Sequence, residues 1–508
     1  MEDLIALVSV VSKQKVRQIE IISEEVKLSK KTKEFYEGIR TGLIKSDLDA
    51  VQILYNQFNV DSKYRKLKGR LRNRLLNTVF FIDVQKFGKS DEETATVRSY
   101  HLLAIMKILK SRTKRKTAMN LADEALKVSL KFDIVDLIIL LTKELKAHYG
   151  VFEYNKKKYA YYADLHKKFL YIFSYEIRAS NMYITLAQKI LKFNKSEITQ
   201  NSIDELRELE ITLTKISSFK YNFDTYNSLY FYYYLIKDYQ KLVEISGKAV
   251  SFFQSKPGFL KIGIFDFLQK QGVAKYILGD LIEAIKVYEE ALNMNPREGG
   301  TAWFNIRNHL FNAHLKCKEY DIAYKYLLES LSISKFKNLY ESFKEPWLIK
   351  EAYMQLLIKM GKIEEDKDSK NKLRPFRINR FLNEVPLYSR DKSGRNIAIL
   401  IIHVLFLFIQ KKDDELQRRL DALGQYSFRY LRNDETLRSN AFIKMLQKLP
   451  DANYHPKGIE RRVDKFYKRL VETPMNISED SAETEVIPYE HLWEIVLELL
   501  QMRVNKEI

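Results

Sequence analysis

The sequence predicts an all-α protein built from antiparallel helix pairs. Only 16 Gly and 9 Pro occur among 508 residues, so few positions interrupt a helix. Apolar residues recur with the 3.6-residue period of amphipathic helices along much of the chain. Hydrophobic residues make up 46% of the sequence, a content too apolar for a disordered protein. A chain of this length and composition is expected to form several helical domains or one long solenoid.

The N-terminal region, residues 1–212, is expected to contain degenerate helix pairs. Residues 35–55 place Gly38 and Ala50 twelve residues apart, and the segments 117–132 and 134–150 show the helical period. The chain opens with Glu2 and Asp3 rather than with basic residues, which argues against an export signal.

The clearest helix pair spans residues 272–296. Ala284 and Ala291 allow its second helix to approach the first, and Tyr288 is expected to fill the space between the two helices. Gly279 falls in the turn between them, and Pro296 stops the second helix. The same spacing is repeated upstream over residues 226–253 and downstream over 303–334, where Ala323 takes the place of Ala284.

These three units, over about residues 222–335, resemble tetratricopeptide repeats, which are helix pairs of about 34 residues. The resemblance is degenerate, because Lys275 stands where the repeat usually has an aromatic residue. It implies an α-solenoid of stacked helix pairs, with the repeats occupying residues 213–365.

The region 366–508 is expected to form a helical extension after a basic linker that runs from Glu365 to Arg395. Residues 397–409 are almost entirely apolar, but this segment is too short to cross a bilayer and is predicted to be a helix buried on all sides. Further helices are expected over 459–472 and 489–504, separated by a polar stretch from Thr473 to Pro488.

The resemblance also implies a binding surface. Tetratricopeptide repeats hold a peptide or a partner helix on the concave face that their first helices line. Asn305, Asn308 and Asn312 recur at helical spacing on one such face and suggest an exposed polar strip, although a merely solvated face remains an alternative. The groove positions of the repeat correspond here to Asp224, Asn227, Tyr234, Gln269, Tyr276, Asn305, Asn308, Asn312 and Lys316.

The net charge of +20 raises a second possibility. Basic clusters occur over residues 63–74, 107–116 and 367–380. They are either solvated helix surfaces or a surface that contacts the phosphates of a nucleic acid, in a regulator rather than a scaffold. The residues expected to make such contacts are Lys63, Arg65, Lys66, Lys68, Arg70, Arg72, Arg74, Lys114, Arg115 and Lys116.

No motif in the sequence points to catalysis. The tetrapeptide at residues 87–90 resembles the end of a phosphate-binding loop, but Asp83 stands in place of its first glycine. His309 and His314 are five residues apart, so a helix would place them on different faces, and the single cysteine, Cys317, has no second cysteine with which to bind zinc. We therefore expect no enzyme activity and no cofactor. The sequence favours a cytoplasmic scaffold that binds a protein or peptide, with no membrane span, over a nucleic-acid-associated regulator.

Overall fold

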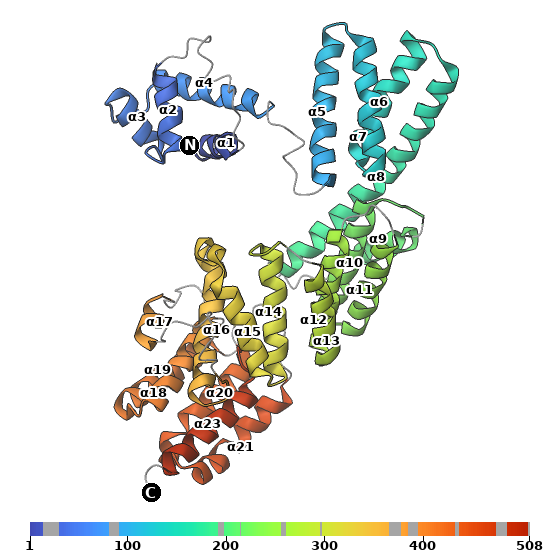
Figure 1. The fold of residues 1–508 in the computed structure, drawn as a ribbon. Helices are drawn as coiled ribbons and strands as arrows, with labels where there is room; N and C mark the ends of the chain where they lie inside the picture. Colours follow the sequence, from blue (N-terminus) through green and yellow to red (C-terminus); the bar gives the residue numbers. More distant parts are fainter. Residues whose placement is uncertain are drawn as a thin grey trace. The chain divides into compact units, whose positions relative to one another are not determined.

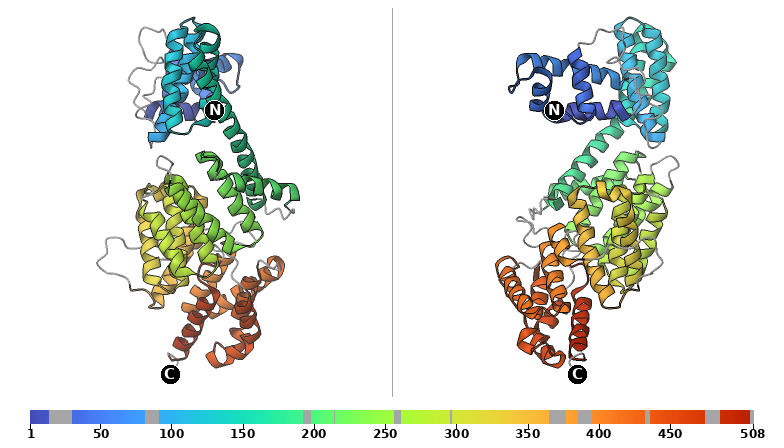
Figure 2. Two further views of the ribbon diagram at one scale, coloured as in Figure 1. Left: turned by 90° about the vertical axis from the view of Figure 1, so that its right-hand side faces the viewer. Right: turned by 60° about the vertical axis from the view of Figure 1, so that its left-hand side comes forward.

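The computed structural model contains only helices and connecting turns among the residues it describes. These residues are 1–13, 30–80, 91–191, 198–213, 215–255, 261–294, 297–364, 377–384, 395–431, 436–473 and 485–505. Figures 1 and 2 show coiled ribbons throughout these ranges. The predicted all-α class is therefore confirmed. Pro296 and most of the two predicted linkers lie outside the described residues.

The chain separates into two compact units, and the long helix α8 and helix α10 each contribute residues to both. The first unit comprises residues 1–185 and 197–225. Its helices are α1 (Glu2–Lys13), α2 (Lys30–Arg40), α3 (Asp47–Tyr55), α4 (Ser62–Val79), α5 (Asp91–Ser111), α6 (Arg115–Lys131), α7 (Val135–Ala147), α8 (Lys156–Leu191) and α9 (Gln200–Thr212), with a π-helical turn at His148–Phe152.

The second unit comprises residues 186–196 and 226–508. Its helices are α10 (Phe219–Leu235), α11 (Tyr239–Gln254), α12 (Lys261–Ile277), α13 (Leu281–Asn293), α14 (Thr301–Lys316), α15 (Tyr320–Ser332), α16 (Glu341–Lys359), α17 (Ile378–Glu384), α18 (Arg395–Ile409), α19 (Asp413–Tyr430), α20 (Leu437–Gln447), α21 (Pro456–Glu472) and α23 (Tyr489–Asn505), with 3₁₀ turns at Ser334–Asn338 and Pro450–Ala452. One apolar core extends from Trp303 on α14 to Leu500 on α23.

The helix pair predicted at residues 272–296 packs as its small residues require. Ala284 and Ala291 on α13 are fully buried, and so is Tyr288. Gly272 on α12 lies directly beneath the Tyr288 ring, because a Cβ placed there would be 2.3 Å from its Cε1 atom. The pairs α12–α13 and α14–α15 each pack as neighbours along the chain (Figure 1).

One type of turn ends many of these helices. The N–H of Asp280 donates to the carbonyl of Lys275 at 3.0 Å, and Gly279 between them has a left-handed backbone, which together form a Schellman motif. The same bond and the same backbone geometry recur with the left-handed residue at Thr113, Asp133, Lys237, Lys318, Gly361 and Lys411. The recurrence extends the helix-pair pattern beyond the three units that the sequence identifies.

Helix α18 confirms the prediction of an all-round buried helix. Every residue from Asn396 to Phe408 is buried. Tyr353 of α16 donates its hydroxyl to the α18 carbonyl of Ala398 at 2.9 Å, which fixes these two helices against each other. Among the described residues, no helix is both long enough and apolar enough to cross a membrane.

Candidate binding groove

Helices α12 and α14 bring two of the predicted groove residues into contact. The ammonium of Lys316, at the end of α14, lies 4.7 Å above the ring of Tyr276 on α12. One face of α14 therefore meets α12 through Lys316. The same face meets α16 through Asn308, whose amide oxygen accepts a hydrogen bond from Lys350.

Lys350 is a cation in an apolar setting that sequence reasoning did not identify. Its side chain is only 2% exposed, and its ammonium lies 5.1 Å from the ring centre of Phe311 and 5.2 Å from that of Trp347. Aromatic faces and the Asn308 oxygen replace part of the hydration that a buried ammonium loses. Asn308 therefore supports the packing of α14 on α16 rather than standing free for a partner.

The remaining predicted groove residues differ in exposure. Asn305 is exposed on α14, whereas Gln269 and Asn312 are partly buried. Tyr234 is partly buried and packs against a small apolar cluster that includes Tyr230, Leu242 and Ala274. Asn227 and Asp224 on α10 are buried, and Asp224 belongs to the first unit. Asn305 is therefore the most accessible predicted groove residue.

His309 packs beside this face as a neutral aromatic group. Its ring stacks on Tyr288 at 5.1 Å with an interplanar angle of 7°. Burial lowers the pKa of His309 to about 4, and the positive charge of Lys350 lowers it further. The imidazole is consequently uncharged at neutral pH and connects the second helix α13 to the first helix α14 by stacking.

The chain's own residues 485–489 are buried in the apolar core to which α14 and α16 also contribute. Glu485 and the next residues of this segment are buried, and Ile487 is fully enclosed. Burial raises the pKa of Tyr276, and the Glu485 carboxylate raises it further. Burial lowers the pKa of Lys316, while Glu485 opposes that effect. The charge of Glu485 therefore acts on two residues that the repeat pattern assigns to the groove.

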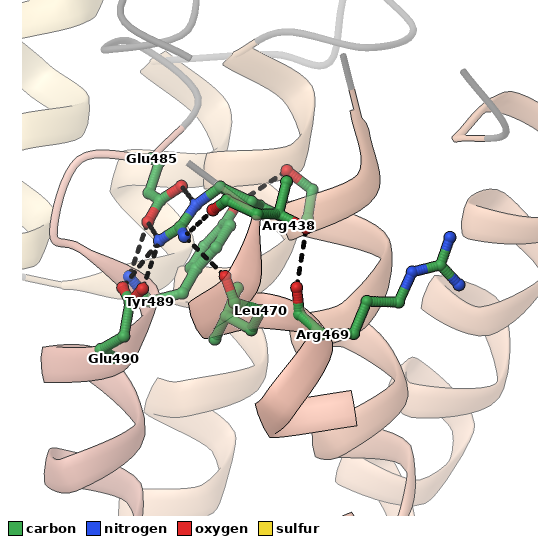
Figure 3. Close-up of polar contacts among 8 residues, drawn as sticks. Arg438, Arg469, Leu470, Glu485, Tyr489 and Glu490 are labelled. Carbon is green, nitrogen blue, oxygen red and sulfur yellow. Dashed lines mark hydrogen bonds and ion pairs between the residues drawn. The ribbon is translucent and has the colours of Figure 1, made fainter. Parts of the chain in front are cut away.

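Arg438 anchors this segment from α20, as Figure 3 shows. Its guanidinium binds Glu485 through Nε at 3.0 Å and through Nη2 at 2.7 Å, and Nη2 also reaches Glu490 at 2.7 Å. The Nη1 group donates to the carbonyls of Leu470 and Thr473, each at 2.8 Å. All N–H groups of the guanidinium thus have acceptors in a site where the arginine is 8% exposed.

Helix α23 continues from this anchor along the turns of successive helix pairs. Glu494 pairs with Lys318 in the α14–α15 turn at 2.7 Å. Glu498, one helical turn further, pairs with Lys362 after α16 at 2.8 Å, and Arg503 pairs with Asp413 at the start of α19 at 2.5 Å. The last helix therefore contacts three turns of the second unit.

The predicted phosphate-contacting residues are partly available. On α4, Lys63, Arg65, Lys66, Arg70 and Arg72 are exposed, and Arg74 is partly buried. Lys68 instead pairs with Asp47 at 2.7 Å. In the second cluster, Lys114 and Lys116 are exposed, and Arg115 stacks on Phe152 with its Cζ atom 3.4 Å from the ring centre. In the third cluster, residues 367–376 lie outside the described residues.

A second buried polar cluster lies in the first unit. Ser218 donates its hydroxyl to Glu176 of α8 at 2.5 Å, and Asp133 accepts the N–H of Phe219 at 2.7 Å, so both carboxylates meet the start of α10. Burial raises the pKa of Glu176 to about 7 and that of Asp133 to about 6. The negative charge of Asp133 contributes to the raised pKa of Glu176.

No group of His, Cys, Asp and Glu side chains within the described ranges is arranged to hold a metal ion. Cys317 is partly buried at the end of α14, and burial raises the pKa of its thiol. Neither a scan against protein-family models nor a search of curated proteins finds a match to the chain, so the interpretation of the groove depends on its geometry.

Proposed function

We propose that the chain is a protein-interaction scaffold whose stacked helix pairs form a superhelix of the tetratricopeptide type. Its inner face, lined by α12, α14 and α16, holds an extended segment of polypeptide. The observation that carries the proposal is the burial of residues 485–489 in the apolar core that α14 and α16 also line. A surface that buries one extended segment has the shape and the polar groups to receive another.

The partner segment meets the part of the face that residues 485–489 leave accessible. Asn305 is exposed there, and Gln269 on the neighbouring helix is partly exposed. An amide side chain offers both a donor and an acceptor, which suits hydrogen bonding to a peptide backbone. We expect a cytoplasmic protein partner, in keeping with a chain that has a single cysteine.

Site-specific photocrosslinking in the native cell tests the proposal. A photoreactive amino acid is placed at Asn305 in one variant and at Glu290 in a control, because Glu290 is exposed on the second helix α13. We expect one discrete crosslinked partner from position 305 and none from position 290. Equal labelling at both positions, or no discrete product at position 305, would show that this face does not bind a partner.

A further inference from the structure

Helix α4 carries a charge pattern that the scaffold proposal does not use. Its sequence, SKYRKLKGRLRNRLLNTV, contains no acidic residue. It packs into the core of the bundle formed by α1 to α4 through Tyr64, Leu67, Leu71 and Leu75. The side of α4 away from that core faces solvent over the whole length of the helix, about 27 Å for 18 residues.

Exposed cations lie in two rows along α4. At 100° per residue, Lys63, Lys66 and Arg70 fall on one side of the solvent face, and Arg65 and Arg72 fall on the other. No ion pair is found for any of these five side chains within the described part of the chain, in contrast to Lys68, which Asp47 neutralises. The two rows leave a strip between them that carries no charge.

The strip between the rows is uncharged and mostly small. It consists of Ser62, Gly69, Asn73 and Leu76, and Leu76 is 37% exposed. A glycine inside a helix costs stability relative to alanine, so its presence needs a reason. At Gly272 the reason is the Tyr288 ring, but at Gly69 no atom lies within 4 Å of the position that a Cβ would take. Packing within the chain therefore does not require a glycine at position 69. Close approach of another molecule to this face of α4 would require one.

We propose that α4 binds double-stranded DNA with its Gly69–Asn73 strip in the major groove and one row of cations on each phosphate strand. The major groove is about 12 Å wide and admits a helix, while the phosphates on its two edges match two separated rows of positive charge. Asn73 then reaches the base edges, where an amide side chain suits adenine. With Leu76 as its single exposed large apolar side chain, the strip is also unsuited to a membrane surface, which needs several such side chains facing outward.

The first experiment measures binding of the full chain to a fluorescein-labelled DNA duplex of about two helical turns by fluorescence anisotropy. With about four phosphate contacts, the association constant should fall roughly 100-fold between about 50 and 200 mM salt. Two double variants, Lys66→Gln/Arg70→Gln and Arg65→Gln/Arg72→Gln, each remove two cations from one row. Each should lower the affinity for the duplex at least about 10-fold. Each should also reduce the slope of the logarithm of the association constant against the logarithm of the salt concentration by about 2. The control is Lys114→Gln with Lys116→Gln, two exposed cations of the second basic cluster.

The second experiment tests the strip. Gly69→Leu should leave the melting temperature unchanged or higher, because the space is open and Leu is a better helix former. The same variant should weaken duplex binding at least about 10-fold, because its side chain would keep the helix out of the groove. Circular dichroism of each variant verifies that the bundle is folded.

Competitor ligands separate DNA from other polyanions. An RNA duplex should bind about 10-fold more weakly, since its major groove is too narrow for a helix, and vesicles of phosphatidylserine and phosphatidylcholine should not compete. The proposal is overturned if the DNA does not bind, if the Lys114/Lys116 control loses as much affinity as the α4 variants, if Gly69→Leu binds normally, or if RNA or vesicles bind as tightly as DNA.

Discussion

Arg438 is a buried cation on which several chain segments depend. Removing its side chain would leave Glu485 as a buried carboxylate without its ion pair. We expect Arg438→Met to lower the free energy of unfolding by about 3–5 kcal/mol, as measured by urea denaturation. The control is Lys318→Met, which breaks the exposed pair with Glu494 and should cost under about 1 kcal/mol. If the double variant Arg438→Met/Glu485→Leu is no more stable than Arg438→Met, the unpaired charge is not the cause.

Glu176 makes the stability of the first unit depend on pH. Its pKa in the folded chain is about 7, above the ordinary value of 4.5, owing to burial and then to the neighbouring Asp133 and Asp136, which Ser218 and Lys220 only partly oppose. The folded state therefore binds more protons between about pH 4.5 and 7, and stability falls as the pH rises through this range.

Glu176→Gln should weaken that dependence, because an amide resembles the protonated acid, while Asp133 with its pKa of about 6 retains part of it. We expect the variant to be about 1–3 kcal/mol more stable than the wild type at pH 8 and similar to it near pH 4. Melting temperatures from pH 4 to 8 measure the effect, with Glu208→Gln, an exposed α9 carboxylate, as the control. A wild-type profile that rises from pH 5 to 7 would contradict the assignment.

Asn308 and Asn312 form a matched pair on α14. Both are partly buried, but only Asn308 accepts a hydrogen bond from the buried Lys350. Asn308→Ala should therefore cost about 1–3 kcal/mol, because the ammonium loses an acceptor. Asn312→Ala should change stability by less than about 0.5 kcal/mol. Equal melting temperatures for the two variants would exclude a structural role for Asn308.

At the scale of elements, the helix pairs were predictable only where small residues mark them. Gly272, Ala284 and Ala291 give the α12–α13 pair a recognisable spacing, and the structure confirms their packing. In the other turns, the residue type at the left-handed position gives no sign of that backbone conformation. Thr113, Lys237 and Lys411 adopt it because the surrounding helices require the turn, so their identity carries no signal.

These turns offer a direct test of backbone strain. Lys237→Gly should raise the free energy of unfolding by up to about 1 kcal/mol, because a left-handed backbone costs a non-glycine residue about 1–2 kcal/mol. Gly279→Ala, in the equivalent turn of the next helix pair, should lower it by about the same amount. Thermal melting of the two variants compares them, and a change of the same sign in both would rule out the explanation.

At the scale of the whole molecule, only part of the candidate groove could be predicted from the sequence. The residues that α12 and α14 contribute follow from the repeat register. The ion pair between Glu485 and Arg438 could not be predicted, because the local sequence does not indicate that these two distant segments are in contact. Residues 485–488 also lack helical periodicity and belong to a stretch that resembles a linker.

Helix α23 should stabilise the second unit mainly by its apolar side. Ending the chain at residue 473 would expose the core residues that pack on Leu492, Val496 and Leu500. We expect the truncated chain to bind an apolar dye and to aggregate. The variant Glu494→Gln/Glu498→Gln keeps that side and loses two ion pairs, so it should elute at the wild-type volume, with its free energy of unfolding lowered by under about 2 kcal/mol. Size-exclusion chromatography and dye fluorescence compare the truncated chain with the glutamine variant. Aggregation of the glutamine variant would show that the ion pairs, rather than the apolar side of α23, stabilise the second unit.

The late position of residues 485–505 has a consequence for biosynthesis. A ribosome releases the chain from its N-terminus, and α12, α14, α16 and α18 emerge before the segment that covers them. Their apolar surfaces therefore remain uncovered until residues 485–505 have been synthesised, whereas the bundle of α1 to α4 has a core of its own. The nascent second unit should depend on chaperones that bind apolar surfaces, and a message truncated before codon 485 should yield a product that cellular proteases degrade.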